Sequence, residues 1–72
     1  MINETLRGLS DIQTALVNRV QKEVGEIAAA SLEEVLRKGP KAKRFKAINL
    51  IQLRKICILA DETGVDLPTK DL

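Results

Sequence analysis

Cationic side chains are concentrated in one short stretch of this sequence. The ten residues RKGPKAKRFK, 37–46, hold six cations and no acid, and the wider segment 37–55 holds eight cations and no acid. The flanking parts are acidic: residues 1–36 have three cations and six acids, and residues 56–72 have one cation and four acids. The net charge of +2 therefore conceals a strongly basic segment, which suits a partner that carries phosphate groups or carboxylates.

Four of the cations in residues 37–46 follow Pro40, where the sequence predicts the start of a second helix. The helix dipole disfavours cations at that end, so they gain nothing locally. A helix N-terminus binds anions well, because its first backbone N–H groups are free to donate. We therefore expect an anion-binding site made mainly of Lys41, Lys43, Arg44 and Lys46, with Arg37, Lys38, Arg54 and Lys55 in support. The alternative is a solvated basic surface that keeps an apolar protein soluble.

The chemical class of the ligand stays open. Phe45 is the single aromatic residue, whereas modules that read single-stranded RNA stack bases on several aromatic rings. The second helix is also too apolar for a recognition helix in a DNA groove. The remaining alternatives are backbone-directed nucleic-acid binding, a nucleotide-like phosphate ligand, or docking of a small adaptor or inhibitor on an acidic protein. In size and composition alone, the chain resembles small helical regulators of phages and plasmids.

Side chains that could perform catalysis are scarce. The chain has no histidine, which excludes the Ser–His and Cys–His nucleophile pairs. The single cysteine, Cys57, lies between Ile56 and Ile58, which predicts a buried thiol and excludes an intrachain disulfide. No cluster of thiolates or carboxylates predicts a zinc site. We expect a protein that is not an enzyme and that needs neither a cofactor nor a metal.

Glycine and proline divide the chain into two helical segments. Gly39 and Gly64, each followed by proline within four residues, are stop signals. Apolar residues recur from residue 2 to residue 35 near the 3.6-residue helical period, and Ser10 with Gln13 fits a capping box. We predict one small domain over 1–72, with an N-terminal turn or short extra helix at 1–9, helix one at 10–38, a turn at 39–42, helix two at 43–63 and a polar tail at 64–72.

Helix two is apolar on most of its circumference. Its apolar residues are Phe45, Ile48, Leu53, Ile56, Leu59 and Ala60 on one face, and Ala47, Leu50, Ile51, Cys57 and Ile58 on the other. Such a helix must be buried on most sides, and a short chain offers little core for this. We therefore predict an all-α fold in which the long helix and helix two form an antiparallel hairpin that self-associates into a helical bundle, most simply a homodimer of four helices.

The predicted oligomer interface includes part of helix one. Gly25 and Ala29 share one side of it, where small residues would let another helix approach closely; the alternative is a glycine merely tolerated within a helix. The full predicted interface is Leu50, Ile51, Cys57, Ile58, Gly25 and Ala29. We expect a cytoplasmic protein without membrane contact, because no apolar stretch approaches the roughly 20 residues that cross a bilayer and the first residues lack the pattern of a signal peptide.

Overall fold

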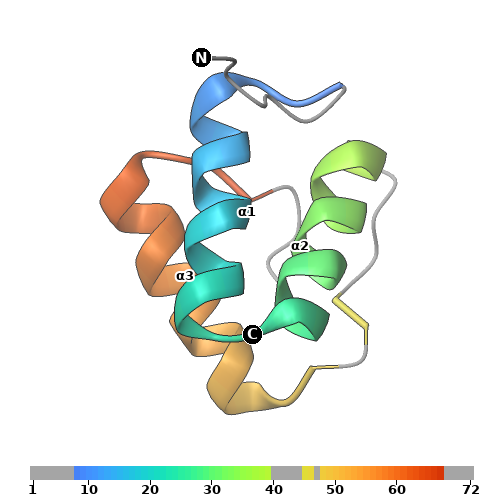
Figure 1. The fold of residues 1–72 in the computed structure, drawn as a ribbon, viewed down its shortest axis with the longest axis vertical. Helices are drawn as coiled ribbons and strands as arrows, with labels where there is room; N and C mark the ends of the chain where they lie inside the picture. Colours follow the sequence, from blue (N-terminus) through green and yellow to red (C-terminus); the bar gives the residue numbers. More distant parts are fainter. Residues whose placement is uncertain (1–7, 40–44, 47, 68–72) are drawn as a thin grey trace.

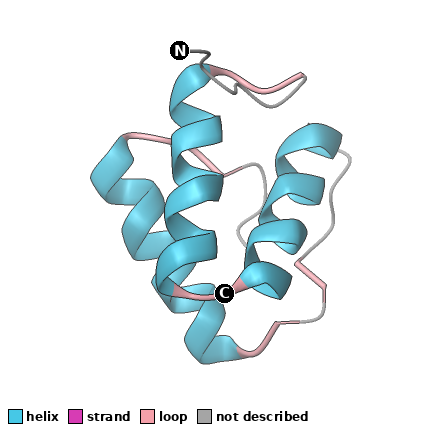
Figure 2. Cartoon of the chain, in the orientation of Figure 1, coloured by secondary structure: helices cyan, strands magenta, loops and turns pink. Residues whose placement is uncertain are grey.

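The described part of the chain is helical. The structure is a computed structural model that describes residues 8–39, 45–46 and 48–67, and these contain three α-helices and no strand (Figures 1 and 2). Helix α1 spans Asp11–Glu23, α2 spans Glu26–Lys38 and α3 spans Leu50–Thr63. The predicted all-α class is confirmed. The N-terminal turn or short helix predicted at residues 1–9 falls mostly on residues 1–7, which lie outside the described residues.

The prediction of one continuous helix at 10–38 was wrong, because the chain breaks at Val24 and Gly25. Gly25 has φ 146° and ψ 167°, a backbone conformation open essentially to glycine alone. The N–H groups of Val24 and Gly25 both donate to the Val20 carbonyl oxygen, at 2.7 and 3.0 Å, which ends α1. Gly25 then starts α2, since its carbonyl oxygen accepts the Ala29 N–H at 3.0 Å.

The break folds the first segment back on itself. Figure 1 shows α1 running in one direction and both α2 and α3 running in the other. Helix α1 packs against both, and more extensively against α2 than against α3. The antiparallel neighbours in this chain are therefore α1 with α2 and α1 with α3. The predicted pairing of one long helix with a second helix is replaced by three short helices.

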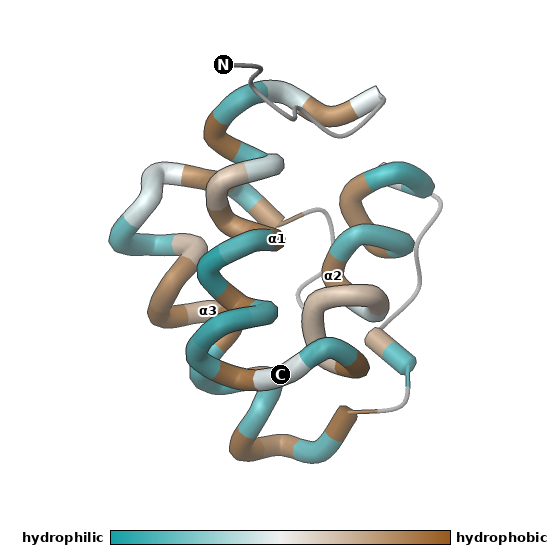
Figure 3. Tube along the Cα trace, viewed as in Figure 1, coloured by the Kyte–Doolittle hydropathy of each residue, from teal (hydrophilic) through white to brown (hydrophobic). Residues whose placement is uncertain are grey.

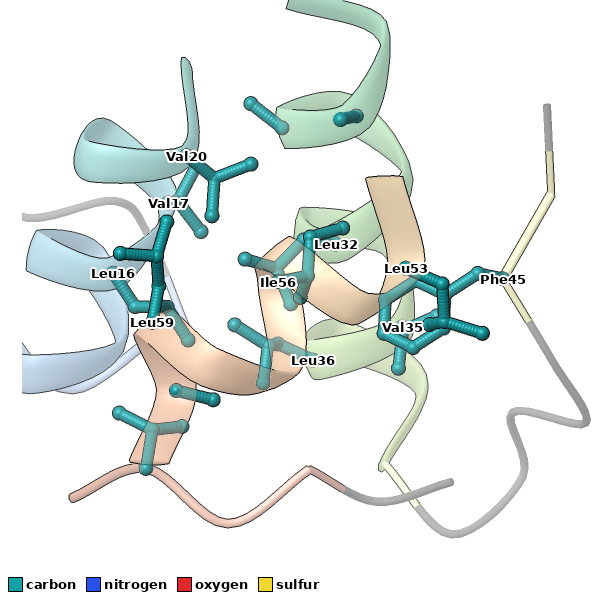
Figure 4. Close-up of a cluster of buried hydrophobic side chains, with 14 of the residues drawn as sticks. Leu16, Val17, Val20, Leu32, Val35, Leu36, Phe45, Leu53, Ile56 and Leu59 are labelled. Atoms are coloured by element: carbon teal, nitrogen blue, oxygen red, sulfur yellow. The ribbon is translucent and has the colours of Figure 1, made fainter. Parts of the chain in front are cut away.

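The core lies between the three helices. Leu16 and Val20 of α1, Leu32 of α2 and Ile56 of α3 are completely buried. Figure 4 shows Ile56 close to Leu32, and the Phe45 ring close to Leu53. Of the face opposite the predicted interface, Phe45, Leu53, Ile56, Leu59 and Ala60 are buried, whereas Ile48 is only half-buried; Phe45 and Ile48 precede α3. The other buried apolar residues are Leu9, Val17, Ala28, Ala29, Val35, Leu36 and Val65.

Helix α3 begins seven residues later than predicted, at Leu50 rather than at residue 43. Asn49 caps it in a second capping box: its Oδ1 accepts the Gln52 N–H at 2.8 Å, and the Gln52 Oε1 accepts the Asn49 N–H at 3.1 Å. Phe45 and Lys46 precede it without helical structure, and the Lys46 N–H donates to the buried Ser31 Oγ at 3.0 Å. This hydrogen bond attaches the connection to α2.

Helix α3 ends as predicted, at Gly64, whose φ of 79° and ψ of 23° lie in the left-handed region. The Val65 N–H donates to the Ala60 carbonyl oxygen at 2.9 Å, which closes a Schellman motif. Val65 is buried and Leu67 packs partly against the core. The prediction of a polar tail at 64–72 was therefore wrong for its first residues, and residues 68–72 lie outside the described residues.

Candidate binding surface

The predicted cations do not lie at the start of α3. Lys41, Lys43 and Arg44 fall outside the described residues, and Lys46 lies three residues before the capping residue Asn49. Two backbone N–H groups at this helix end are already used by the capping box. The predicted position at a helix N-terminus was therefore wrong for Lys46, because α3 begins at Leu50, and for Lys41, Lys43 and Arg44 it stays a prediction.

Two of the supporting cations are neutralised by their own helix. Arg37 donates to the Glu33 Oε2 through Nε at 2.9 Å and through Nη2 at 2.7 Å, and Lys38 Nζ lies 2.9 Å from the Glu34 Oε2. Both pairs are four residues apart and lie near the α2 C-terminus, where cations are also favoured by the helix dipole. The Lys38 hydrogen bond, then its charge, and lastly the charge of Lys46 hold the pKa of Glu34 below its ordinary value.

Within the basic segment 37–55, three described cations are exposed and form no ion pair with another described residue. Lys46 lies in the connection before α3, and Arg54 and Lys55 lie in the first half of α3. The described positive surface is therefore centred on α3 and the segment leading into it. The spacing Glu33–Arg37 and Glu34–Lys38 was visible in the sequence and would have indicated that Arg37 and Lys38 differ from these three.

The outer face of α3 is apolar and exposed. Leu50, Ile51 and Ile58 expose 53%, 68% and 58% of their surface, and Cys57 is half-buried at the edge of this face. Figure 3 shows hydrophobic residues along much of α3 and a hydrophilic C-terminal end. These four predicted interface residues share one surface of the helix. Their role in self-association stays a prediction.

The other two predicted interface residues do not belong to that surface. Ala29 is only 5% exposed because it is packed in the core of this chain, so it has little surface to offer a second one. Gly25 terminates a helix and is not part of a small-residue strip within one. For both residues, a role in an oligomer interface stays a prediction.

An ion-pair network beside Ile58 was not visible in the sequence. Arg19 of α1 contacts Glu23 at 2.8 Å and Glu62 of α3 at 2.9 Å. Arg19 and Glu62 are brought together only by the packing of α1 against α3. Next to them is an open hollow of about 230 Å³, which is lined by Arg19, Glu23, Val24, Lys55, Ile58, Leu59 and Glu62.

The described residues contain no group of three His, Cys, Asp or Glu side chains that could hold a metal ion. Burial raises the pKa of the Cys57 thiol, so less of it is thiolate at neutral pH. None of the described helices has the length and apolar character needed to cross a membrane. Comparison with protein-family models, curated proteins and solved structures found no match for this chain.

Proposed function

We propose that this chain is a non-enzymatic, self-associating binding protein that uses its basic segment, residues 37–55, to hold the phosphate groups of a nucleic acid or a nucleotide-like ligand. The observation that carries this proposal is the gathering of eight cations without an acid in that segment. Exposed Lys46, Arg54 and Lys55, which form no ion pair with a described residue, support it. The free thiol suits a reducing compartment, and we propose a cytoplasmic location.

The cations of the segment are not equivalent in this proposal. Arg37 and Lys38 must leave Glu33 and Glu34 before they can bind a phosphate, so they contribute less than cations without a carboxylate partner. The main binding residues are Lys41, Lys43, Arg44 and Lys46, with Arg54 and Lys55 in support. Contacts of this kind recognise phosphates and carry no base sequence information.

Fluorescence anisotropy with labelled duplex DNA, single-stranded RNA and ATP tests this function. Binding that neutralises four phosphates on DNA should weaken with salt at a log–log slope of about −3.6. The quadruple variant Lys41→Gln/Lys43→Gln/Arg44→Gln/Lys46→Gln should lose most of the affinity and most of this slope. Lys22→Gln/Lys70→Gln removes two cations outside the segment and serves as the control, which should bind nearly as the wild type does.

Circular dichroism should show unchanged helix content in both variants. The proposal fails if none of the three probes binds at low salt, or if the control loses as much affinity as the quadruple variant.

A second function is favoured by the exposed apolar side chains of α3, namely a small adaptor or inhibitor that docks on an acidic protein. The apolar contact would then carry most of the affinity and the cations would mainly speed association. In that case the quadruple variant should associate more slowly yet keep its partner, even from a nuclease-treated lysate. Loss of all binding in the variant supports the phosphate ligand instead.

A further inference from the structure

The exposed face of α3 combines apolar and charged residues in a defined order. Ile51 and Ile58 lie seven residues apart, which is about two helical turns, so they share one side of the helix. The cations Arg54 and Lys55 lie between them, and two acids, Asp61 and Glu62, follow Ile58; all four are exposed. At about 100° per residue these six side chains fall within an arc of about 120°.

The charges are arranged symmetrically about Ile58. Arg54 and Lys55 precede it by four and three residues, and Asp61 and Glu62 follow it by three and four. We infer that this face docks onto α3 of a second copy of the chain in an antiparallel pair, with the twofold axis at Ile58. This inference deepens the self-association in the proposed function and rests on it.

The twofold axis makes the face complementary to itself. It sets Ile58 against Ile58 of the second copy. Because an antiparallel twofold pairs each flank of the helix with the same flank of the second copy, Arg54 lies beside Asp61 and Lys55 beside Glu62, and each charge pair forms twice. A parallel pair would set Arg54 beside Lys55. An antiparallel pair shifted to bring Ile51 against Ile58 would set Arg54 beside Arg54. Both alternatives juxtapose like charges, so the charges select one register.

The acids at the end of α3 are not stabilised by the helix itself. Its last turn holds Asp61 and Glu62 and no cation, although the dipole disfavours negative charge there. Glu62 is paired with Arg19 of α1, whereas Asp61 forms no ion pair with a described residue. Cations from a second copy would compensate both carboxylates.

The hollow beside Ile58 gives the opposing isoleucine a place to pack. Its apolar floor comes from Val24 and Leu59, and the charged groups of Arg19, Lys55 and Glu62 border it. An acidic protein partner would meet Arg54 and Lys55 but would be repelled by Asp61 and Glu62, which is why a second copy is the better occupant. The main phosphate-binding residues of the proposed function, Lys41, Lys43, Arg44 and Lys46, take no part in this pairing.

The contact is small. It involves only one helix and the edge of α1 from each chain. We therefore expect it to bury less surface than the roughly 1,200–2,000 Å² of a standard stable interface. We expect a dimer that dissociates in the micromolar range or above, and a monomer that stays folded on its own core.

Cysteine cross-linking tests the register. In a Cys57→Ser background, Ile58→Cys places a thiol at the axis, within the 4.4–6.8 Å Cα separation of a disulfide. Ile51→Cys in the same background is the matched control, since it is also exposed but would lie about 21 Å from its counterpart, at 1.5 Å per residue. Mild copper-phenanthroline oxidation at millimolar protein should link the first variant and leave the second mainly monomeric. Equal linking of both variants overturns the inference.

Charge exchange tests the complementarity independently. Asp61→Lys/Glu62→Lys should weaken self-association about tenfold or more in sedimentation equilibrium, because cations then face cations. Adding Arg54→Glu/Lys55→Glu to the same chain exchanges the signs and should restore the wild-type affinity to within about threefold, since the antiparallel pair is complementary again. The inference is overturned if Asp61→Lys/Glu62→Lys self-associates like the wild type. It is also overturned if the fourfold variant, with Arg54→Glu/Lys55→Glu added, remains monomeric.

The two proposals fail separately. The quadruple glutamine variant of residues 41–46, combined with Cys57→Ser and Ile58→Cys, should still cross-link if only the phosphate function is wrong. Conversely, DNA binding by a Cys57→Ser/Ile58→Cys variant that fails to cross-link would remove the α3 pair and leave the phosphate function standing.

Discussion

Ser31 shows how a single polar residue in an apolar stripe can attach a connection to a helix. Its side chain is buried, with 6% exposed, and its hydroxyl accepts the Lys46 N–H. The hydrogen bond is only partly buried, and a typical intramolecular hydrogen bond contributes about 0.5–1.5 kcal/mol to stability. We expect Ser31→Ala to lower the free energy of unfolding by about that amount in urea titrations, and to speed hydrogen exchange at the Lys46 amide.

Ser10→Ala is the control for that experiment. It removes the N-cap of α1, where the Ser10 Oγ accepts the Gln13 N–H at 3.2 Å, and should cost about 1 kcal/mol. Exchange at the Lys46 amide, corrected for the loss of global stability, should not change. If Ser31→Ala leaves this corrected exchange rate unaltered as well, the hydrogen bond does not hold the connection.

Glu34 reports the ion pair at the end of α2. Lys38 lowers its pKa, so the carboxylate favours the folded state above the ordinary glutamate range, and this contribution is lost as the pH falls through the lowered pKa. We expect Lys38→Gln to raise the pKa of Glu34 toward its ordinary value in an NMR pH titration. Lys22→Gln, an exposed cation on α1, should leave it in place. A Glu34 pKa that does not move in Lys38→Gln would contradict the pairing.

At the scale of the element, Gly25 decides whether the first segment is one helix or two. Alanine at φ 146° and ψ 167° is strained, at a cost of about 1–3 kcal/mol. We therefore expect Gly25→Ala to lower the urea midpoint, even though alanine favours helix intrinsically. Gly64→Ala, in the left-handed region that other residues enter at a smaller cost, is the comparison and should lose less. A stabilised Gly25→Ala would mean that the continuous helix at 10–38 is accessible after all.

At the scale of the whole molecule, two isoleucines separate folding from assembly. Ile56 is completely buried in the core, whereas Ile58, two residues along the same helix, is 58% exposed. We expect Ile56→Ala to destabilise the monomer by about 2–5 kcal/mol. Ile58→Ala should change the unfolding of dilute protein by less than about 0.5 kcal/mol, as surface substitutions usually do. Thermal and urea unfolding at low micromolar concentration would measure both.

The result for Ile58 decides how closely assembly and folding are linked. If Ile58→Ala unfolds dilute protein as Ile56→Ala does, the three-helix core is not stable alone and the fold needs its second copy. Concentration-dependent unfolding of the wild type would show the same.

Local features of the fold were predictable from the sequence. The helix ends at Gly39 and Gly64, the capping box at Ser10 and the inward face of α3 depend on residues within a turn or two of one another. The position of the basic segment was also predictable, because the charged residues can be located directly in the sequence. The second capping box, Asn49 with Gln52, had a readable signal as well, and would have corrected the start of α3.

Only the tertiary structure decided the break at Gly25, the non-helical course of Phe45 and Lys46, and the pairing of Arg19 with Glu62. A glycine costs only about 1 kcal/mol within a helix, so the sequence alone does not tell whether the helix continues. The fold-back lets α2 cover α1 and α3 and buries Leu32 and Val35. Burial of large apolar side chains, at roughly 1.5–3 kcal/mol each, outweighs that local preference. Phe45 is likewise buried beside Leu53 in a non-helical segment, and α3 starts later than predicted. The free energy gained by burying the ring exceeds the small helix propensity of these residues.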